Sequence, residues 1–256
     1  MADVEIHQFP CLSDNYGVLL RDSASGLVAA IDAPNADQVE AALTQRGWKL
    51  THILTTHHHA DHTDGNLALK ERYRCTIVGP RAEAAKIPGI DTQVGEGDTF
   101  KFGEVEVRVF DTPGHTLGHI SYWLPEVGVA FAGDTMFALG CGRVIEGTME
   151  MMWNSLAKLT KLPADTVIYA GHEYTAANAK FALTIEPENA DLQKRAKEID
   201  ALRASGKPTL PTRLEDELAT NPFLRVTSLA IRKRLNLENA KDWQVFAEVR
   251  ERKNKS

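Results

Sequence analysis

The stretch that decides the fold is THILTTHHHADHTDG, residues 51–65, in which a short apolar run is followed at once by a cluster of histidines and aspartates. We expect residues 51–56 to form a buried strand. That strand would deliver the segment from His57 to His62 onto the loop at its carboxyl end, where α/β proteins usually bind their ligands. The pattern therefore raises the question of whether this loop holds a metal.

The spacing within the cluster predicts which side chains act together. In an extended segment His57 and His59 project to the same side, whereas His58 points the other way. We therefore expect His57 and His59 to be one pair of ligands and His58 to be no ligand. Asp61 and His62 follow on the turn into the next helix, close enough to bind a second ion.

Three more candidate ligands follow other apolar runs. They are His115 in DTPGHTLGH, Asp134 in FAGDT and His172 in IYAGHEY, and each lies next to a glycine that lets the backbone approach closely. With the first four, the set comprises His57, His59, Asp61, His62, His115, Asp134 and His172. Five imidazoles and two carboxylates fit two four- or five-coordinate ions that share Asp134. A lone His-x-His pair would not be enough to predict a metal site. We expect His7 and His52 to have no role in metal binding, and His119 to support the site through a hydrogen bond.

The rest of the chain divides into a mixed part and a helical part. Strand patterns are expected at 26–32, 75–80, 105–110, 119–124, 127–134 and 165–172, and helix patterns at 35–47, 66–73 and 148–162. Such a mixed order is typical of a layered α/β sandwich. Beyond about residue 175 we expect helices at 188–206 and 241–256, joined through a proline-containing connector at 209–224.

Composition limits the partners of the chain. The 35 acidic and 29 basic residues give a formal charge of −6, which argues against nucleic acid or an anionic membrane. The three cysteines include no C-x-x-C pair, and the N-terminus has no targeting pattern, so we expect a reduced, cytoplasmic location. Cys141 lies in a Gly-Cys-Gly turn and is interpreted as a small buried residue, not a nucleophile.

The ligand motifs THHHADHTDG, TPGHTLGH, FAGDTMF and GHEYT resemble those of the metallo-β-lactamase superfamily. The stretches GCGRVIEGT (140–148), NPFLR (221–225) and VRERK (249–253) narrow the resemblance to glyoxalase II, the hydroxyacylglutathione hydrolases, over essentially the full length. This resemblance implies an αββα metallo-β-lactamase sandwich at residues 1–173. A smaller all-helical, substrate-binding domain would follow at 174–256.

The resemblance also implies an activity and roles for individual residues. The reaction would be hydrolysis of S-D-lactoylglutathione and related 2-hydroxyacylglutathiones to D-lactate and glutathione, the second step of methylglyoxal detoxification. His57, His59 and His115 would hold the first metal, and Asp61, His62 and His172 the second, with Asp134 between them. Two ions, most simply zinc but also iron or manganese, would bind a bridging hydroxide as the nucleophile. Asp61 and Asp134 would also orient that hydroxide.

The implied substrate site involves both parts of the chain. Arg143 and Tyr174 would line the glutathione site, and Arg250 and Lys253 would meet its carboxylate. Ile145 departs from the family, which usually has an aromatic residue there, and this puts one contact to the glutathione backbone in doubt. We expect a monomer that acts on this small thioester, without nucleic acid or membrane.

Other functions remain open at this stage. A persulfide dioxygenase is similar in the H-x-H-x-D-H region, although NPFLR and VRERK argue against it. A β-lactamase fits poorly with a bridging Asp134 and a helical C-terminus, and a nuclease of the superfamily would be expected to carry a basic surface. A non-catalytic metal- or glutathione-binding protein would be separated from an enzyme by a thioester turnover assay.

Overall fold

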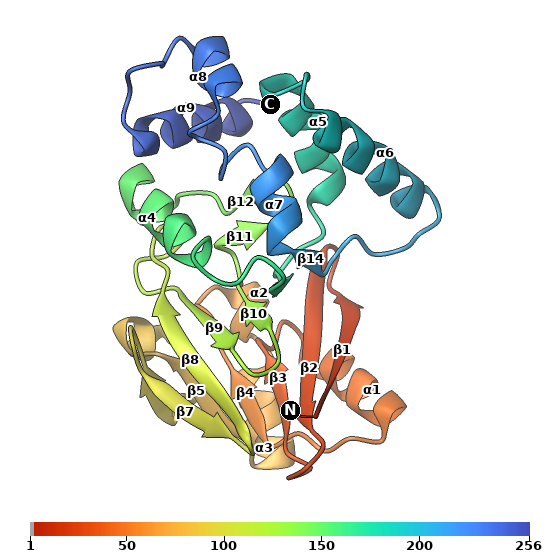
Figure 1. The fold of residues 1–256 in the computed structure, drawn as a ribbon. Helices are drawn as coiled ribbons and strands as arrows, with labels where there is room; N and C mark the ends of the chain where they lie inside the picture. The colour runs from red at the N-terminus through yellow and green to blue at the C-terminus, as the bar shows by residue number, and fades with distance from the viewer. Residues whose placement is uncertain (1–2) are drawn as a thin grey trace. The chain divides into compact units, whose positions relative to one another are not determined.

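Strand β4 (His52–Leu54) lies at the beginning of the stretch quoted above, in a computed structural model that describes residues 3–256. It pairs in parallel with β3 (Val28–Ile31) on one side and β5 (Thr76–Pro80) on the other. The strand expected at 51–56 is therefore confirmed, with slightly narrower bounds. Because β3, β4 and β5 run the same way, the segments that leave their carboxyl ends emerge at one edge of the sheet (Figure 1).

These three strands belong to a six-stranded sheet in the order β1-β2-β3-β4-β5-β6. Its other members are β1 (Val4–Cys11), β2 (Asn15–Asp22) and β6 (Thr92–Val94). The β1-β2 and β2-β3 pairs are antiparallel, and β5 and β6 are parallel. Between β5 and β6 the chain forms the short 3-10 helix η1 (Arg81–Lys86).

Helices pack on this sheet through an apolar cluster. Helix α1 (Ala36–Arg46) starts where the Asn35 side chain accepts a hydrogen bond from the Gln38 amide, and it ends at Gly47, which has a φ of 66°. This confirms the helix expected at 35–47, and α3 (Asn66–Tyr73) confirms the helix expected at 66–73. Val39 and Leu43 of α1 and Leu69 of α3 are buried in one cluster with strand residues such as Ile53.

A second set of strands is antiparallel throughout. It consists of β7 (Thr99–Phe102), β8 (Val105–Asp111), β9 (Ile120–Leu124) and β10 (Val129–Phe131). The valines at 105, 107 and 109 are buried, as the alternation predicts. The two sets of strands meet where the buried Tyr122 hydroxyl donates to the Thr55 carbonyl over 2.8 Å.

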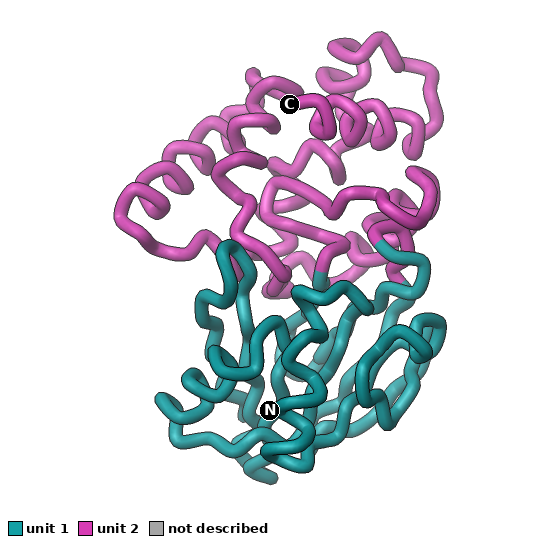
Figure 2. Tube along the Cα trace, turned by 180° about the vertical axis from the view of Figure 1, so that it is seen from behind, with its two compact units in different colours: residues 1–111, 116–133 teal, residues 112–115, 134–256 magenta. Residues whose placement is uncertain are grey.

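The chain separates into two compact units (Figure 2). Unit 1 contains the strands and helices described so far, up to Asp111 and again over Thr116–Gly133, and unit 2 contains Thr112–His115 and Asp134–Ser256. Unit 2 comprises β11 (Met136–Phe137), β12 (Gly140–Cys141), α4 (Met149–Leu159), β13 (Val167–Tyr169), α5 (Thr175–Ile185), α6 (Ala190–Ala204), β14 (Thr212–Arg213), α7 (Leu214–Thr220), α8 (Leu229–Leu235) and α9 (Asp242–Asn254).

Apolar helix faces form the core of unit 2. Helices α5 and α6 pack through Ala179, Ala182, Leu192 and Ile199. Phe223 is fully buried, with ring centroids 5.9 Å from Phe181 and 6.2 Å from Phe246. These contacts attach the NPFLR stretch to α5 and α9.

The helical part contains more structure than the sequence pattern predicts. The helices expected at 148–162, 188–206 and 241–256 are present as α4, α6 and α9. The interpretation of 209–224 as a connector is wrong, because the segment holds β14 and α7. The first turn of α7 carries three acidic residues, which favour a helix N-terminus. Helices α5 and α8 were not expected either. The division at 173/174 stays a prediction.

Candidate metal centre

His57 and His59 leave the carboxyl end of β4 and face one another. The Nε2 atom of the fully buried His57 lies 3.2 Å from Nδ1 of His59, and the ring centroids are 4.8 Å apart. Two imidazole nitrogens that converge in this way can act as ligands to one ion. His58 has a different neighbour, since its Nδ1 lies 2.9 Å from Oε2 of Glu83.

Asp61 and His62 lie on the one-turn helix α2 (Ala60–Thr63), directly after the extended His59. His62 is 1% exposed, and its Nε2 lies 3.7 Å from Oδ2 of Asp61. The ring of His62 also lies 4.1 Å from that of His57, measured between centroids. The turn therefore places a carboxylate and an imidazole together beside the first histidine pair.

In unit 2 the imidazoles of two remaining candidates, His115 and His172, converge on a carboxylate oxygen of the third, Asp134. Oδ2 of Asp134 lies 3.4 Å from Nε2 of His115 and 3.4 Å from Nε2 of His172. All three side chains are buried. Asp134 therefore presents one carboxylate oxygen to two imidazoles at once.

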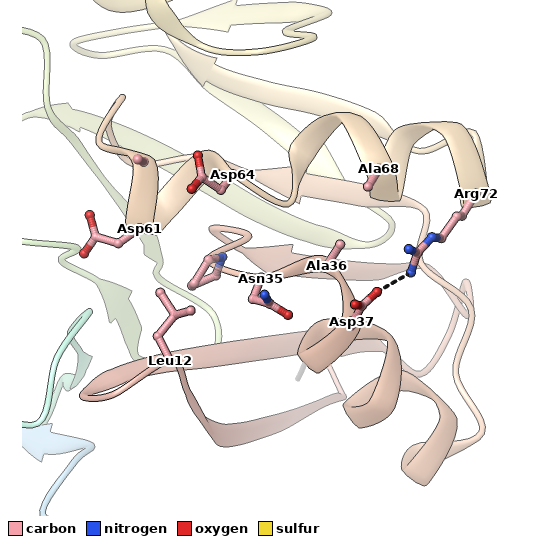
Figure 3. A pocket seen from close by; sticks show the side chains of 10 residues that line it. Leu12, Asn35, Ala36, Asp37, Asp61, Asp64, Ala68 and Arg72 are labelled. Atoms are coloured by element: carbon pink, nitrogen blue, oxygen red, sulfur yellow. Dashed lines mark hydrogen bonds and ion pairs between the residues drawn. The ribbon is translucent and has the colours of Figure 1, made fainter.

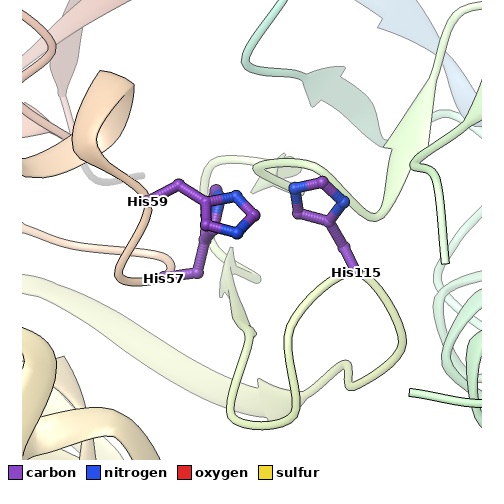
Figure 4. A group of neighbouring side chains, drawn as sticks. All are labelled: His57, His59 and His115. Carbon is purple, nitrogen blue, oxygen red and sulfur yellow. The ribbon is translucent and has the colours of Figure 1, made fainter. Parts of the chain in front are cut away.

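The seven predicted ligands form three groups of three side chains whose ligand atoms lie within 4.8 Å of one another. These groups are His57, His59 and His115 (Figure 4); His57, His62 and Asp134; and Asp61, His62 and His172. Every donor is an imidazole nitrogen or a carboxylate oxygen, a set that fits zinc, iron or manganese. A fourth group joins His58 to Glu83 and Glu146 and includes none of the seven.

A buried carboxylate that the sequence reasoning missed holds His62. Asp32 is 5% exposed and follows β3 in a left-handed conformation, with a φ of 58°. Its Oδ2 lies 2.8 Å from Nδ1 of His62, and its Oδ1 accepts the Thr56 amide over 2.7 Å. Since a carboxylate only accepts, Nδ1 of His62 carries the proton and Nε2 is the unprotonated nitrogen. The available signal was the aspartate that closes the apolar run GLVAAID.

Two further contacts orient ligands. The Asn15 side chain donates to the carbonyl of Asp61 over 3.0 Å and to its Oδ2 over 3.2 Å. The carbonyl of Arg143 lies 2.8 Å from Nδ1 of His115, which leaves Nε2 of His115 directed toward Asp134. His119 is fully buried with its ring 4.8 Å from that of His57, and its role as a hydrogen-bonding support stays a prediction.

A cavity of about 520 Å³ opens beside Asp61 (Figure 3). Its walls come from Leu12, Pro34, Asn35, Ala36, Asp37, Ala60, Asp61, Asp64, Ala68 and Arg72. Arg72 is already paired with Asp37 at 3.0 Å and with Glu40 at 2.6 Å. The charged side chains of this cavity therefore do not favour the carboxylates of a glutathione group.

The residues carried over for substrate binding differ in exposure. Arg143 is exposed, and Tyr174 is 37% exposed with its ring stacked on His172 at 4.8 Å. Arg250, by contrast, is 5% exposed and donates from Nη1 to the Cys141 carbonyl over 3.0 Å. Nζ of Lys253 donates to the carbonyl of Ala177 over 3.2 Å. This part of α9 is thus packed against the chain and is not a solvated helix end.

The cysteines are free and buried. Burial raises the pKa of the Cys141 thiol to about 11, and the Arg250 charge offsets only part of this effect. Burial likewise raises the pKa of Cys11 and of Cys75. A thiol with so high a pKa is not a nucleophile, which confirms that Cys141 is a small buried residue.

Comparison with known proteins places this geometry in a family. The model described as metallo-beta-lactamase superfamily matches residues 17–172, and the model described as hydroxyacylglutathione hydrolase C-terminus matches residues 173–256. The chain belongs to the hydroxyacylglutathione hydrolase family. Curated members include the hydroxyacylglutathione hydrolases of Brucella ovis, 58% identical over 98% of this chain and 97% of that protein, and of Chelativorans sp., 54% identical over 98% of each.

Solved structures agree with the expected fold. The chain is similar to ETHE1 from Myxococcus xanthus, with 27% identity, a TM-score of 0.67 and coverage of 97% of this chain and 98% of that one. The BLEG-1 B3 metallo-beta-lactamase shares the fold at 20% identity and a TM-score of 0.65, over 86% of this chain and 99% of that one. The predicted metallo-β-lactamase fold with a helical C-terminal region is confirmed. Within residues 3–256, no helix has the length and apolar character needed to span a membrane.

Proposed function

We propose that the protein hydrolyses S-D-lactoylglutathione and related 2-hydroxyacylglutathiones to D-lactate and glutathione, as in the second step of methylglyoxal detoxification. The observation that carries the proposal is the complete set of seven nitrogen and oxygen donors in a chain 54–58% identical to proteins named hydroxyacylglutathione hydrolase. The natural partner is then a small thioester, neither nucleic acid nor membrane. We place the protein in the cytoplasm as a monomer, with the substrate-binding domain at 174–256.

We assign the ligands to two divalent ions. His57, His59 and His115 hold the first, Asp61, His62 and His172 the second, and Asp134 is shared. The 3.4 Å distances from Asp134 Oδ2 to His115 and His172 support the shared position. Zinc is the expected metal, and iron and manganese fit the same donors. When bound, two such ions lower the pKa of a water molecule and polarise the thioester carbonyl.

The protein contributes position and charge to this chemistry. Asp61 and Asp134 are the proposed catalytic residues, because each turns a carboxylate oxygen toward the ligand cluster and can orient the attacking water. The hydrogen bonds from Asn15 keep Asp61 in that orientation. The departing group is a thiol with an ordinary pKa near 8.5, so it can leave as the thiolate without a strong acid beside it.

Arg143, Tyr174, Arg250 and Lys253 are proposed to bind the glutathione portion. Tyr174 stacks on the ligand His172, which places an exposed aromatic ring next to the centre. Arg250 and Lys253 lie three residues apart on one face of α9. Lys253 is the more exposed of the two and would meet the carboxylate directly, while the buried Arg250 would add its charge from beneath. Burial, and then the charge of Arg250, lower the pKa of Lys253.

Replacing Lys253 with methionine is expected to raise KM for lactoylglutathione with little change in kcat. The glutathione carboxylates are remote from the thioester, so the contact stabilises substrate and transition state alike. Loss of roughly 1 kcal/mol corresponds to an increase in KM of about five-fold. Lys233→Met, at an exposed lysine of α8, is the matched control. An equal loss on a thioester that lacks the peptide carboxylates would remove Lys253 from the substrate site.

The proposed function is tested by metal analysis beside turnover. Protein purified without added metal is expected to contain close to two ions per chain and to release glutathione from S-D-lactoylglutathione. One ion per chain with oxygen uptake on glutathione persulfide would instead identify a persulfide dioxygenase. Metal binding without turnover of either compound would identify a non-catalytic binding protein.

A further inference from the structure

Glu83 is a buried glutamate to which nothing above assigns a role. It lies in η1 and is 4% exposed. Its Oε2 accepts the backbone amide of His58 over 3.0 Å, and its Oε1 accepts the backbone amide of Gly118 over 2.8 Å. Each oxygen therefore holds a different segment of the chain.

Both segments lie next to the histidines of the first metal. His58 stands between the proposed ligands His57 and His59, so a bond to its amide fixes the peptide unit that joins His57 to His58. Gly118 precedes His119, whose ring lies 4.8 Å from that of His57. The fit around Gly118 is tight, because a Cβ there would come within 2.4 Å of Glu83 Cγ and 2.9 Å of the Ala82 Cβ.

We propose that Glu83 is a positioning residue that sets the spacing of the first-metal ligands His57 and His59 by holding His58 and Gly118 at once. The proposal rests on the function proposed above. An ionised carboxylate is the side chain suited to this task, because both of its oxygens accept and neither donates. A glutamine could accept only one of the two amides and would turn an N–H group toward the other. Glu83 also belongs to the fourth group of possible metal ligands, with His58 and Glu146. Since both of its oxygens already accept backbone amides, we propose that its role is to hold these amides and not to bind a cation.

The test compares Glu83→Gln and Glu83→Ala with Glu186→Gln. Glu186 is also 4% exposed and is held by Arg225, Asn189 and Ser228, none of which is a ligand. The measurements are the affinity for cobalt(II) in competition with a chelator, the visible absorption spectrum of the cobalt protein and the Tm of the metal-free protein. A further variant, His58→Ala, keeps the backbone amide that Glu83 binds.

We expect Glu83→Gln to weaken cobalt binding by about ten-fold, because it removes a group that orients metal ligands. Glu83→Ala should weaken cobalt binding further, and both variants should change the absorption spectrum of the cobalt protein. Glu186→Gln should lower Tm without changing affinity or spectrum, and His58→Ala should bind cobalt nearly as the parent does. Parent-like affinity and spectrum in Glu83→Gln would overturn the proposal, even if Glu83→Ala fails to fold. A parent protein that binds no metal would instead overturn the proposed function, and this inference with it.

Discussion

Asp134→Ala is expected to lose most of its bound metal and nearly all of its activity. Asp134 supplies the anionic oxygen that lies 3.4 Å from both His115 and His172, so its removal affects both ions. Losing a group that only orients a ligand costs about 10- to 100-fold in metal affinity, and losing the shared ligand should cost more. We expect kcat/KM for lactoylglutathione to fall by about a thousand-fold or more, because the electrostatic stabilisation of the transition state goes with the metal.

The measurement is elemental analysis of the purified variant beside its steady-state kinetics. Asp134→Asn is the informative companion, because it keeps the shape of the side chain and removes the charge. Asp165→Ala, at an exposed aspartate of unit 2, serves as the control. Two tightly bound ions and full hydrolysis in Asp134→Ala would rule out a shared carboxylate at this position.

Asp32→Asn is expected to weaken binding of the second metal although Asp32 is not itself a ligand. The asparagine oxygen can accept the Thr56 amide, but its NH₂ group would then face Nδ1 of His62. Nδ1 would become an acceptor and the proton would move to Nε2, the atom needed for the metal. We expect a loss of about 10- to 100-fold in affinity for one of the two ions, with a matching fall in kcat.

Asparagine is the right replacement because the backbone at position 32 is left-handed, with a φ of 58°. Asparagine tolerates that conformation, whereas alanine would add a strain of roughly 1 kcal/mol and confuse stability with metal binding. Asp22→Asn is the matched control, since Asp22 is also buried and accepts from Ser25 and the Glu104 amide, away from the ligands. A titration that shows two ions bound with parent affinity in Asp32→Asn would refute this role for Asp32.

The sequence predicted the parts of the fold whose signal is local. Helix α3 matches the expected 66–73, and the alternation of 105–110 predicts the buried valines of β8, because a side chain's environment there follows from backbone periodicity. The candidate ligands were predicted from segments that follow apolar runs, and their binding of metal stays a prediction. Helix α7 was missed because the prolines of its segment were given more weight than the acidic first turn.

The supporting residues of the candidate site could not be found in this way. Asp32 does close an apolar run, but the Thr56 amide and the His62 imidazole that it binds are distant in the sequence. The amides that Glu83 binds, those of His58 and Gly118, are distant as well, so the roles of both carboxylates follow from tertiary contacts. The same holds for Arg250, whose burial against Phe223 and the Cys141 carbonyl depends on how α9 packs.

The burial of the three cysteines bears on the proposed product. An enzyme that releases glutathione works in the presence of this thiol and its disulfide, which attach to proteins by exchange at exposed thiolates. Cys11, Cys75 and Cys141 are buried, and burial raises the pKa of each thiol, so none of the three offers the exposed thiolate that exchange requires. If glutathione is released at this site, as proposed, these three cysteines are poor targets for the disulfide form of that product.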